Sequence, residues 1–390
     1  MDNYMETDTQ ELERLARRKA RREQMLREKQ LQMRRRRKIK KLLLLGGRVG
    51  LTALILGITG LAAFSFFKEK NMAKEGKEQV VEAIHSSGEN GKNYTDSIVS
   101  GQLSAGSQRE EETNNISTQI IQFRDSSDKK YIYNEEIISS NAILIDIHNN
   151  IVVAGKEERA RISPASMTKV LTLLVAAEHI KEEQLEDTFA ITREITDYGF
   201  INDCSNVGFL EGERVTLRDL FYGTILCSGA DAALGLATYV AGSHEAFVEL
   251  MNNKLKDLGL DKTSHFTNCV GIYNENHYST VYDMAVIMKA AISHDFCKEV
   301  LGARTYTTKT TPEHPEGISI SNWFLRRIED KETGGPVLGA KTGFVNQSGS
   351  CAVSYGSFKD GSPYICVTVG AHSSWRCIYD HVEIYNRYVS

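Results

Sequence analysis

Residues 164–170 read PASMTKV and place a serine and a lysine three residues apart at the start of a predicted helix. Pro164 suits the first turn of a helix, and apolar residues then recur at helical spacing over residues 167–179. We therefore expect Ser166 and Lys169 on one helix face, near the positive end of the dipole. A serine hydroxyl becomes a strong nucleophile when a base takes its proton, and lysine can be that base when burial lowers its pKa.

Two further short strings follow along the chain. SGA at residues 228–230 falls in a break between two apolar helices, where a serine can face a cleft; a helix cap is an equally good interpretation. KTG at residues 341–343 follows an apolar strand entry, and its glycine lets a substrate approach the backbone closely. Together the three strings indicate acyl transfer, which none of them indicates alone.

Two strings of the same kind lie in less suitable places. SDKK at residues 127–130 also spaces a serine and a lysine three apart, but in a charged segment with no predicted helix. KTS at residues 262–264 lies in a polar turn after Gly259. We discount both. Without the other strings, a chance Ser-Lys pair would be the better interpretation of residues 166–169 as well.

The pattern of elements predicts an α/β domain over residues 131–390. β-Branched, apolar stretches predict strands near both ends of this region, at residues 142–147, 151–154, 349–355 and 364–370. Helical spacing of apolar residues predicts helices at 167–179, 216–226, 231–240, 246–258, 281–292 and 373–388. We expect one antiparallel sheet built from both ends of the domain and packed with helices, some of which form a helical subdomain.

The first 130 residues have a different character. Residues 1–41 hold 15 Lys and Arg against 7 Asp and Glu, a balance of +8 within an overall charge of −4, and predict a cytoplasmic basic helical segment. Residues 42–67 predict a transmembrane helix, because residues 49–67 carry no charge and about 20 apolar residues span a bilayer. Residues 68–130 are polar and predict an extracytoplasmic linker.

These segments predict a single-pass protein of the cell membrane. The basic residues before the span place the N-terminus in the cytoplasm and the catalytic domain outside it. A cleaved signal peptide is disfavoured by the long segment before the apolar run and by the missing small-x-small site. A buried soluble helix and a nucleic-acid-binding tail remain as less favoured alternatives, since a basic tail beside a span usually sets topology.

Cysteine and histidine usage gives little sign of a metal or redox site. The seven cysteines are odd in number, so at least one thiol stays unpaired in a monomer, and no CxxC pair occurs. Cys204 and Cys227 could pair, but buried free thiols are the favoured interpretation. No His, Asp and Glu cluster has ligand spacing, so we expect neither a metal nor an organic cofactor.

With these strings, residues 131–390 resemble the low-molecular-weight penicillin-binding proteins, the serine-type D-alanyl-D-alanine carboxypeptidases of peptidase family S11. Ser-x-x-Lys, Ser-Asp-Asn and Lys-Thr-Gly form the motif set of penicillin-binding proteins and class A β-lactamases. The stretches at residues 143–146, 208–212, 276–284 and 338–344 add to the likeness, and the first 130 residues lie outside it. The resemblance implies a β-lactamase/transpeptidase-like fold.

The resemblance also implies a catalytic role for each motif residue. Ser166 would attack the carbonyl of the penultimate D-alanine of a peptidoglycan stem peptide that ends in D-Ala-D-Ala. Lys169 would take and return the proton, and Ser228 would relay protons. Water would then hydrolyse the acyl enzyme, and β-lactam antibiotics would act as covalent inhibitors.

Substrate binding is implied at a second set of residues. Backbone N–H groups of Ser166 and Phe344 would form the oxyanion hole, where one such donor typically contributes about 10²–10³ in rate. An arginine suits the substrate's terminal carboxylate. The residues implied in binding are Lys341, Thr342, Gly343, Phe344 and Arg376.

Two departures from the family pattern leave other functions open. Ala230 stands where the family usually has Asn, which implies lower activity unless a neighbour such as Asn206 substitutes. The chain stops 47 residues after Gly343, without the C-terminal β domain and amphipathic anchor of many relatives, and we expect the N-terminal span to replace that anchor. The alternatives to a carboxypeptidase are a β-lactamase of the same fold, although no Glu-x-x-Leu-Asn string is visible, and a catalytically impaired wall-binding protein.

Overall fold

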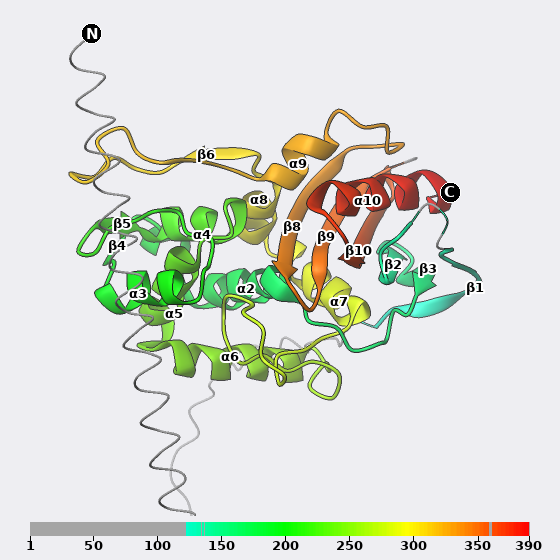
Figure 1. The fold of residues 1–390 in the computed structure, drawn as a ribbon, viewed down its shortest axis with the longest axis horizontal. Helices are drawn as coiled ribbons and strands as arrows, with labels where there is room; N and C mark the ends of the chain where they lie inside the picture. Colours follow the sequence, from blue (N-terminus) through cyan, green and yellow to red (C-terminus); the bar gives the residue numbers. More distant parts are fainter. Residues whose placement is uncertain (1–121, 134, 136, 359–360, 390) are drawn as a thin grey trace, which may run out of the picture. The chain divides into compact units, whose positions relative to one another are not determined.

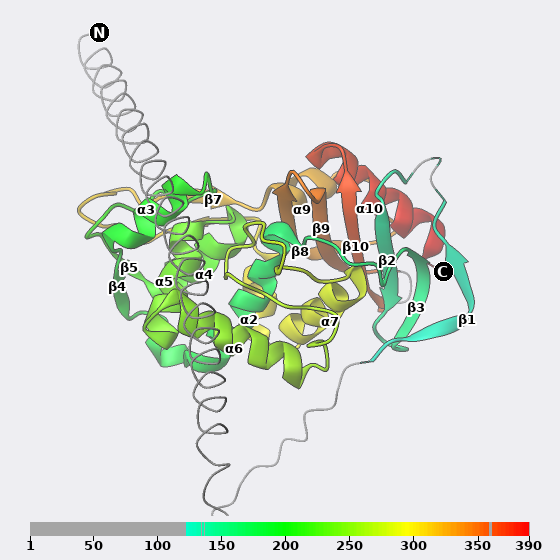
Figure 2. The same cartoon turned by 60° about the horizontal axis from the view of Figure 1, so that its bottom comes forward.

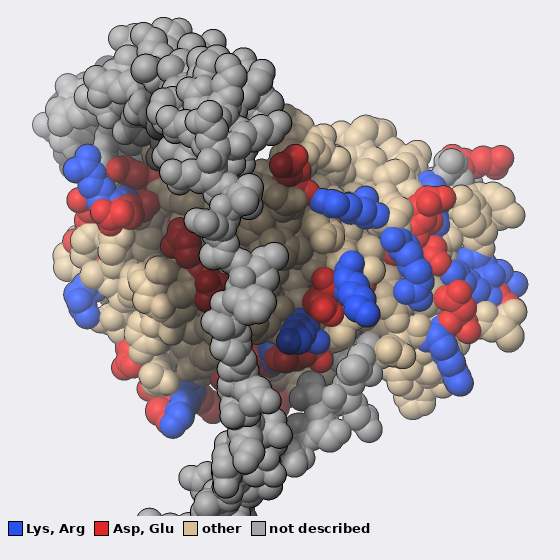
Figure 3. All heavy atoms as spheres, turned by 90° about the horizontal axis from the view of Figure 1, so that it is seen from below, with Lys and Arg blue, Asp and Glu red and all other residues tan. Residues whose placement is uncertain are grey.

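The computed structural model describes residues 122–389 apart from 134, 136, 359 and 360. The predicted segments at residues 1–41 and 42–67, and most of the predicted linker, lie outside the described residues. None of the helices in the described part is long and apolar enough to cross a membrane. On the face shown in Figure 3, basic and acidic side chains are interspersed over the described part.

A six-stranded sheet joins the two ends of the described chain, as the strand pattern predicts (Figure 1). Its strand order is β1-β3-β2-β10-β9-β8. The strands are β1 (Arg124–Tyr131), β2 (Asn141–Asp146), β3 (Ile151–Lys156), β8 (Val337–Val345), β9 (Gly349–Ser357) and β10 (Pro363–Ala371). The central pairing of β2 with β10, whose sequences lie more than two hundred residues apart, is antiparallel. Strand β8 lies at one edge of the sheet.

Strand β1 corrects two expectations. It pairs with β3 in parallel, so the sheet is mixed rather than antiparallel throughout. It also lies within the predicted linker, so the sheet begins at Arg124, seven residues before the predicted domain start at 131. Its sequence RDSSDKKY is mostly exposed and has no apolar alternation, which is why it resembles a linker. Just before it, Phe123 is buried and hydrogen-bonds the Tyr282 hydroxyl with its backbone N–H and C=O.

Helices cover both faces of the sheet (Figures 1 and 2). One face packs against α9 and α10, and the other against α7 with α2 behind it. The helices are η1 (Ala165–Thr168), α2 (Lys169–His179), η2 (Glu182–Gln184), α3 (Arg193–Ile201), α4 (Leu217–Leu226), α5 (Ala230–Ala241), α6 (His244–Asp257), α7 (Val281–Ile292), α8 (Asp295–Gly302), α9 (Trp323–Ile328) and α10 (Ser374–Tyr388). Two short hairpins pair β4 (Thr188–Ala190) with β5 (Arg214–Thr216) and β6 (Thr305–Thr307) with β7 (Ser319–Ser321).

The predicted helices and the observed ones agree closely where apolar spacing is strong. Helices α4, α5, α6, α7 and α10 end within two residues of their predicted limits. Helices α3, α8 and α9 were not predicted, because they are short and only partly buried. Helix α2 is buried all round from Lys169 to Ala177, so it runs through the core and not over the surface. One continuous core reaches from the sheet through α2 into α4, α5 and α6.

Candidate active site

A cavity of about 400 Å³ brings residues of all three sequence strings together. Ser166 and Lys169 come from η1 and the start of α2, Ser228 from the turn between α4 and α5, and Thr342 and Gly343 from β8. Some 170 positions separate the first string from the third. The sheet edge and the buried helix α2 therefore bring to one place groups that are remote in the chain.

The hydroxyl of Ser166 and the amine of Lys169 lie within hydrogen-bond distance. Lys169 Nζ is 3.2 Å from Ser166 Oγ and donates to the backbone oxygen of Val270 at 2.6 Å. The Lys169 side chain is only 2% exposed. Burial lowers the pKa of Lys169 from 10.5 to about 8, because the charged form has lost most of its water. A useful fraction of Lys169 is therefore neutral near physiological pH and able to accept a proton.

The backbone around Ser166 is tightly packed and locally strained. Ala165 has a φ of +48° and Ser228 a φ of +61°, a left-handed conformation that costs side-chain-bearing residues free energy. A Cβ on Gly271 would lie 1.9 Å from the Ala165 oxygen, and one on Gly343 would lie 2.8 Å from the Ser166 nitrogen. The sequence predicts that a substrate approaches the backbone at Gly343, whereas the close approach in the structure is to the backbone of Ser166. Glycines at these two positions let the loop between α6 and α7, and strand β8, pack directly against η1.

The loop between α6 and α7 supplies the backbone oxygen that accepts a hydrogen bond from Lys169. Asn268 Oδ1 accepts hydrogen bonds from the backbone nitrogens of Val270, Gly271 and Ile272 at 3.2, 2.7 and 3.0 Å. His277 Nε2 lies 2.8 Å from Thr168 Oγ1, so the same loop is tied to η1. Burial lowers the pKa of His277 to about 3, which keeps its ring neutral. These contacts fix the position of the Val270 carbonyl beside Lys169.

The second lysine enters the site from β8. Lys341 Nζ donates to Ser228 Oγ at 3.0 Å and to the Thr342 oxygen at 2.7 Å, and the side chain is 1% exposed. Burial, with the positive charge of Lys169 as a second cause, lowers the pKa of Lys341 to about 7. Two ammonium groups in one buried site repel each other, so the pair readily gives up a proton near neutral pH. An anion entering the cavity would restore the lost charge.

Comparisons with known proteins identify the family of the chain. A family model described as D-alanyl-D-alanine carboxypeptidase, of peptidase family S11, matches residues 127–373, more than half of the chain. The chain belongs to this family.

Individual relatives are about a quarter to a third identical to the chain over the residues that match. D-alanyl-D-alanine carboxypeptidase DacF of Bacillus subtilis is 28% identical over 213 residues, which are 55% of this chain and 52% of the relative. The D-alanyl-D-alanine carboxypeptidase of Streptomyces sp. K15 is 31% identical over 51% of this chain and 69% of its own length. The crystal structure of the Streptomyces K15 DD-transpeptidase superposes with a TM-score of 0.59 at 25% identity, covering 65% of this chain and 98% of that one. The chain spans about half the length of several curated relatives, including the first.

The resemblance implies Arg376 in substrate binding, and the structure pairs its side chain with an acidic residue of the same helix. Arg376 does not line the cavity; its Nε donates to Asp380 Oδ1 at 3.1 Å, and the Asp380 side chain is fully buried. Arg327 of α9 lines the cavity instead. Its guanidinium carbon lies 5.1 Å from the ring centre of Trp323 and 4.7 Å from that of Trp375. The cavity is therefore lined by an arginine that the sequence strings did not indicate.

Ala230 and Asn206 do not supply the amide that the family usually has. Ala230 is the first residue of α5, is fully buried, and donates its N–H to the Ser205 oxygen at 2.8 Å. Asn206 donates to the Cys204 oxygen at 3.1 Å and does not line the cavity. Ser205 and Asn202 line this part of the cavity, and neither belongs to a motif. Asn206 was one of two open alternatives for the missing amide, and in this structure its side chain does not line the cavity.

Aromatic residues form the rim. Phe344 is 62% exposed and Trp323 58%, and both line the cavity. The backbone N–H groups of Ser166 and Phe344 remain the predicted oxyanion hole. The only sequence signal for Trp323 and Arg327 is a solvent-facing aromatic and a basic pair on a short helix, which many surface helices share.

Cysteines approach the cavity as free thiols. All seven are unpaired, as the sequence interpretation favoured for Cys204 and Cys227, and Cys204, Cys351 and Cys377 line the cavity. Burial raises the pKa of Cys351 to about 12, which keeps the thiol protonated. Within the described residues, no group of three or more His, Cys, Asp or Glu side chains is placed to hold a metal ion.

Proposed function

We propose that the protein is a membrane-anchored serine D,D-carboxypeptidase that removes the terminal D-alanine from peptidoglycan stem peptides through an acyl enzyme on Ser166. The observation that carries this proposal is the buried Lys169 amine, 3.2 Å from the Ser166 hydroxyl at the wall of an open cavity. Membership of the carboxypeptidase family supports the same reaction.

Acylation begins with a proton transfer. Neutral Lys169 takes the proton of Ser166 as Oγ attacks the carbonyl carbon of the penultimate D-alanine. The backbone N–H groups of Ser166 and Phe344 stabilise the oxyanion that develops. When this intermediate collapses, the peptide C–N bond breaks and the proton passes from Lys169, through Ser228, to the amine of the leaving D-alanine. The peptide is then an ester of Ser166.

Deacylation repeats these steps with water. Lys169, again neutral, takes a proton from a water molecule that attacks the ester carbonyl. The ester C–O bond breaks, Ser166 regains its proton, and the shortened peptide leaves with a new carboxylate. Each half-reaction begins when a neutral amine takes a proton, first from the Ser166 hydroxyl and then from water. The lowered pKa of Lys169 therefore serves both half-reactions.

The edge position of β8 suits an extended peptide. Strand β8 pairs only with β9 in the sheet, so its other edge faces the cavity and can hydrogen-bond a substrate backbone. The substrate's terminal carboxylate would lie beside Lys341 and Thr342, where it would favour the protonated form of Lys341. Arg327 at the rim adds a second positive charge on the path of an anionic substrate.

Labelled penicillin and a peptide ending in D-Ala-D-Ala test the proposal on the full-length protein. We expect a long-lived penicillin adduct on Ser166 and release of D-alanine from the peptide. Rapid turnover of penicillin would favour a β-lactamase. Neither adduct nor release would favour the wall-binding alternative, for which the buried Ala230 in place of Asn is the specific observation.

Membrane anchoring is proposed from the sequence, through the apolar span at residues 42–67 with the basic segment on its cytoplasmic side. The site would then lie outside the cell, where peptidoglycan is. A Tyr133→Cys variant tests this, since Tyr133 is 71% exposed in the described domain. A membrane-impermeant maleimide should label that variant in intact, wall-stripped cells, beyond the labelling of the unmodified protein. Labelling only after lysis would contradict export.

A further inference from the structure

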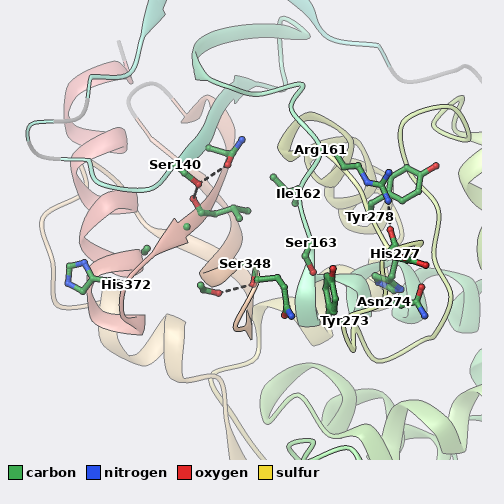
Figure 4. Close-up of a pocket in the computed structure, with 17 residues that line it drawn as sticks. Ser140, Arg161, Ile162, Ser163, Tyr273, Asn274, His277, Tyr278, Ser348 and His372 are labelled. Carbon is green, nitrogen blue, oxygen red and sulfur yellow. Dashed lines mark hydrogen bonds between the residues drawn. The ribbon is translucent and has the colours of Figure 1, made fainter.

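A second cavity, of about 660 Å³, lies next to the active site and takes no part in the chemistry above (Figure 4). Its volume falls in the range of roughly 300–1,000 Å³ that small-molecule sites occupy. The loops before η1, after α6 and between β8 and β9 all contribute to its wall, together with the start of β2 and the end of β10.

The two cavities share their dividing walls. Ile272 lines the active site and Tyr273 the second cavity; Ser350 lines the first and Gly349 the second. The residues of each pair are neighbours in the chain, and their Cα atoms are about 3.8 Å apart. The linings of the two cavities therefore meet within one residue at these points. Ser163 lines the second cavity only three residues before Ser166, which places the two Cα atoms at most about 11 Å apart. The two cavities therefore lie close enough for an extended ligand bound in one to reach toward the other.

The lining of the second cavity is polar and balanced in charge. It contains hydroxyl and amide side chains, with Arg161 and Glu275 as one basic and one acidic residue. The Arg161 guanidinium is already engaged, since it donates to the Glu275 backbone oxygen and lies 3.7 Å from the centre of the Tyr278 ring. An anion would therefore find no free cationic partner in Arg161. Hydroxyls and amides offer both donors and acceptors, which suits an uncharged ligand with many hydroxyl groups.

Two features point to a ligand in this cavity. The hydroxyl oxygen of Ser163 is buried and has no hydrogen-bond partner among the described residues, and buried polar atoms are rarely left so. Tyr273, on the same wall, is 46% exposed and presents an aromatic side chain at the opening. Figure 4 shows Ser163, Tyr273 and Asn274 on one side of the cavity and Ser348 and His372 across from them. An aromatic face beside hydroxyl and amide groups matches a sugar ring, which has apolar C–H faces and polar edges.

We propose that this second cavity binds an uncharged amino sugar of the glycan to which the stem peptide is attached. The inference rests on the proposed function for the link between the cavities: peptide in the first, sugar in the second. The substrate would then be a glycopeptide and not a free peptide. Amide side chains at Asn274 and Gln347 would hydrogen-bond the acetamido group, and Tyr273 would contact the ring.

Direct binding tests the cavity without any catalysis. The probe is N,N′-diacetylchitobiose, an uncharged disaccharide of N-acetylglucosamine, titrated into the full-length Ser166→Ala protein and followed by saturation-transfer NMR. We expect a dissociation constant of about 1 mM or lower, weakened at least tenfold in Tyr273→Ala with Gln347→Ala. Tyr133→Ala, which removes an exposed tyrosine outside both cavities, is the matched control and should bind as the parent does. No binding by the parent, or equal binding of maltose, would overturn the inference.

Turnover then tests the link between the cavities. We expect kcat/KM for D-alanine release to be at least fivefold higher for a disaccharide-pentapeptide than for the free pentapeptide. The Tyr273→Ala, Gln347→Ala protein should lose this preference, while the Tyr133→Ala protein should keep it. Equal rates for both substrates in the parent protein would overturn the link. If neither substrate releases D-alanine, the proposed function fails, and the titration still decides whether the cavity binds the sugar.

Discussion

Two clusters of serine and basic side chains lie on opposite sides of strand β9, and only one of them has the geometry of a reaction site. The open cluster, Ser166, Lys169, Ser228 and Lys341, borders the active-site cavity. The sealed cluster, Ser354, Thr368, His381 and Tyr385, lies between the sheet and α10. In it Ser354 Oγ is 2.8 Å from His381 Nδ1 and 2.7 Å from the Tyr385 hydroxyl, and His381 Nε2 is 3.0 Å from Thr368 Oγ1.

The difference shows that residue types alone do not make a catalytic site. A serine beside a histidine is a common nucleophile and base, yet no residue of the sealed cluster is more than 1% exposed. Burial lowers the pKa of His381 to about 3, which leaves a neutral ring that serves only as a hydrogen-bond partner. Burial also lowers the pKa of Lys169, but only to about 8, and at that pKa an amine can take a proton near neutral pH. Access and the starting pKa decide which cluster can react.

The largest expected effect comes from removal of the nucleophile in the open cluster. We expect Ser166→Ala to lower D-alanine release by at least about 10³-fold, since nucleophile removal in serine hydrolases costs that much or more. The thermal unfolding temperature should change little. Release of D-alanine and penicillin labelling measure the effect, with the exposed Ser293→Ala as control. Labelling that persists in Ser166→Ala would falsify the assignment.

The sealed cluster should respond in the opposite way. Ser354→Ala removes the hydrogen-bond partner that His381 Nδ1 and the Tyr385 hydroxyl share, and the loss of one such hydrogen bond costs about 0.5–1.5 kcal/mol. We expect the free energy of unfolding to fall by roughly 1–3 kcal/mol, a factor of about 5 to 150 in the folding equilibrium. Denaturant titration measures this fall.

Catalysis at permissive temperature is the matching readout for Ser354→Ala. The kcat of the folded protein should stay within about twofold of the parent, because Ser354 lies outside the active-site cavity. A large fall in kcat with unchanged stability would show that the sealed cluster takes part in the reaction.

The pH dependence of acylation should report the open cluster. Lys169 must be neutral to take the proton, and its pKa of about 8 lies below the ordinary 10.5. The amine is half neutral at pH 8 and about 1% neutral at pH 6, so the acylation rate should drop roughly 50-fold between these two pH values. Stopped-flow acylation by a chromogenic β-lactam measures it. A rate that keeps rising to pH 10 would mean that Lys169 keeps its ordinary pKa.

The smallest effects are expected from the two arginines, one of which should affect substrate binding and the other stability. Arg327→Ala removes a positive charge from the cavity rim and should raise KM for the peptide about three- to tenfold with little change in kcat. Arg376→Ala instead leaves the buried Asp380 with only its hydrogen bonds to Ile138 and Ser139, and should lower stability. Steady-state kinetics and thermal unfolding of both variants decide the matter. The reverse outcome would restore Arg376 to the substrate site.

The sequence predicts the parts of the fold in which apolar spacing is strong. Helix α7 shows its period plainly and matches residues 281–292, and strands β2 and β10 are apolar on both faces. Strand β1 was missed, because an exposed edge strand can be polar throughout and then looks like a linker. The order of strands also escapes a single sequence, because pairing across more than two hundred residues leaves no local signal.

The candidate site was predicted as far as its motifs extend. The serine, lysine and glycine strings carry short-range spacing, and the structure brings Ser166, Lys169, Ser228 and Gly343 together. Arg327 could not be distinguished from Arg376, because which guanidinium faces the cavity depends on how α9 and α10 pack against β8 and β9. Asn268 and His277 were missed for a similar reason: they act on backbone groups of a loop whose shape the sequence does not reveal.

The left-handed backbone at Ala165 and Ser228 has a consequence for how the protein tolerates change. Each of these residues would be relieved of roughly 1 kcal/mol or more by a glycine, which adopts such angles freely. Ser228→Gly would also delete the hydroxyl that accepts from Lys341, and Ala165→Gly would give the backbone beside Ser166 more freedom, so either gain in stability would come at the active site. Selection for thermal stability and selection for turnover should therefore favour different residues at these two positions. Substitutions meant to raise stability are better placed in the polar edge strand β1.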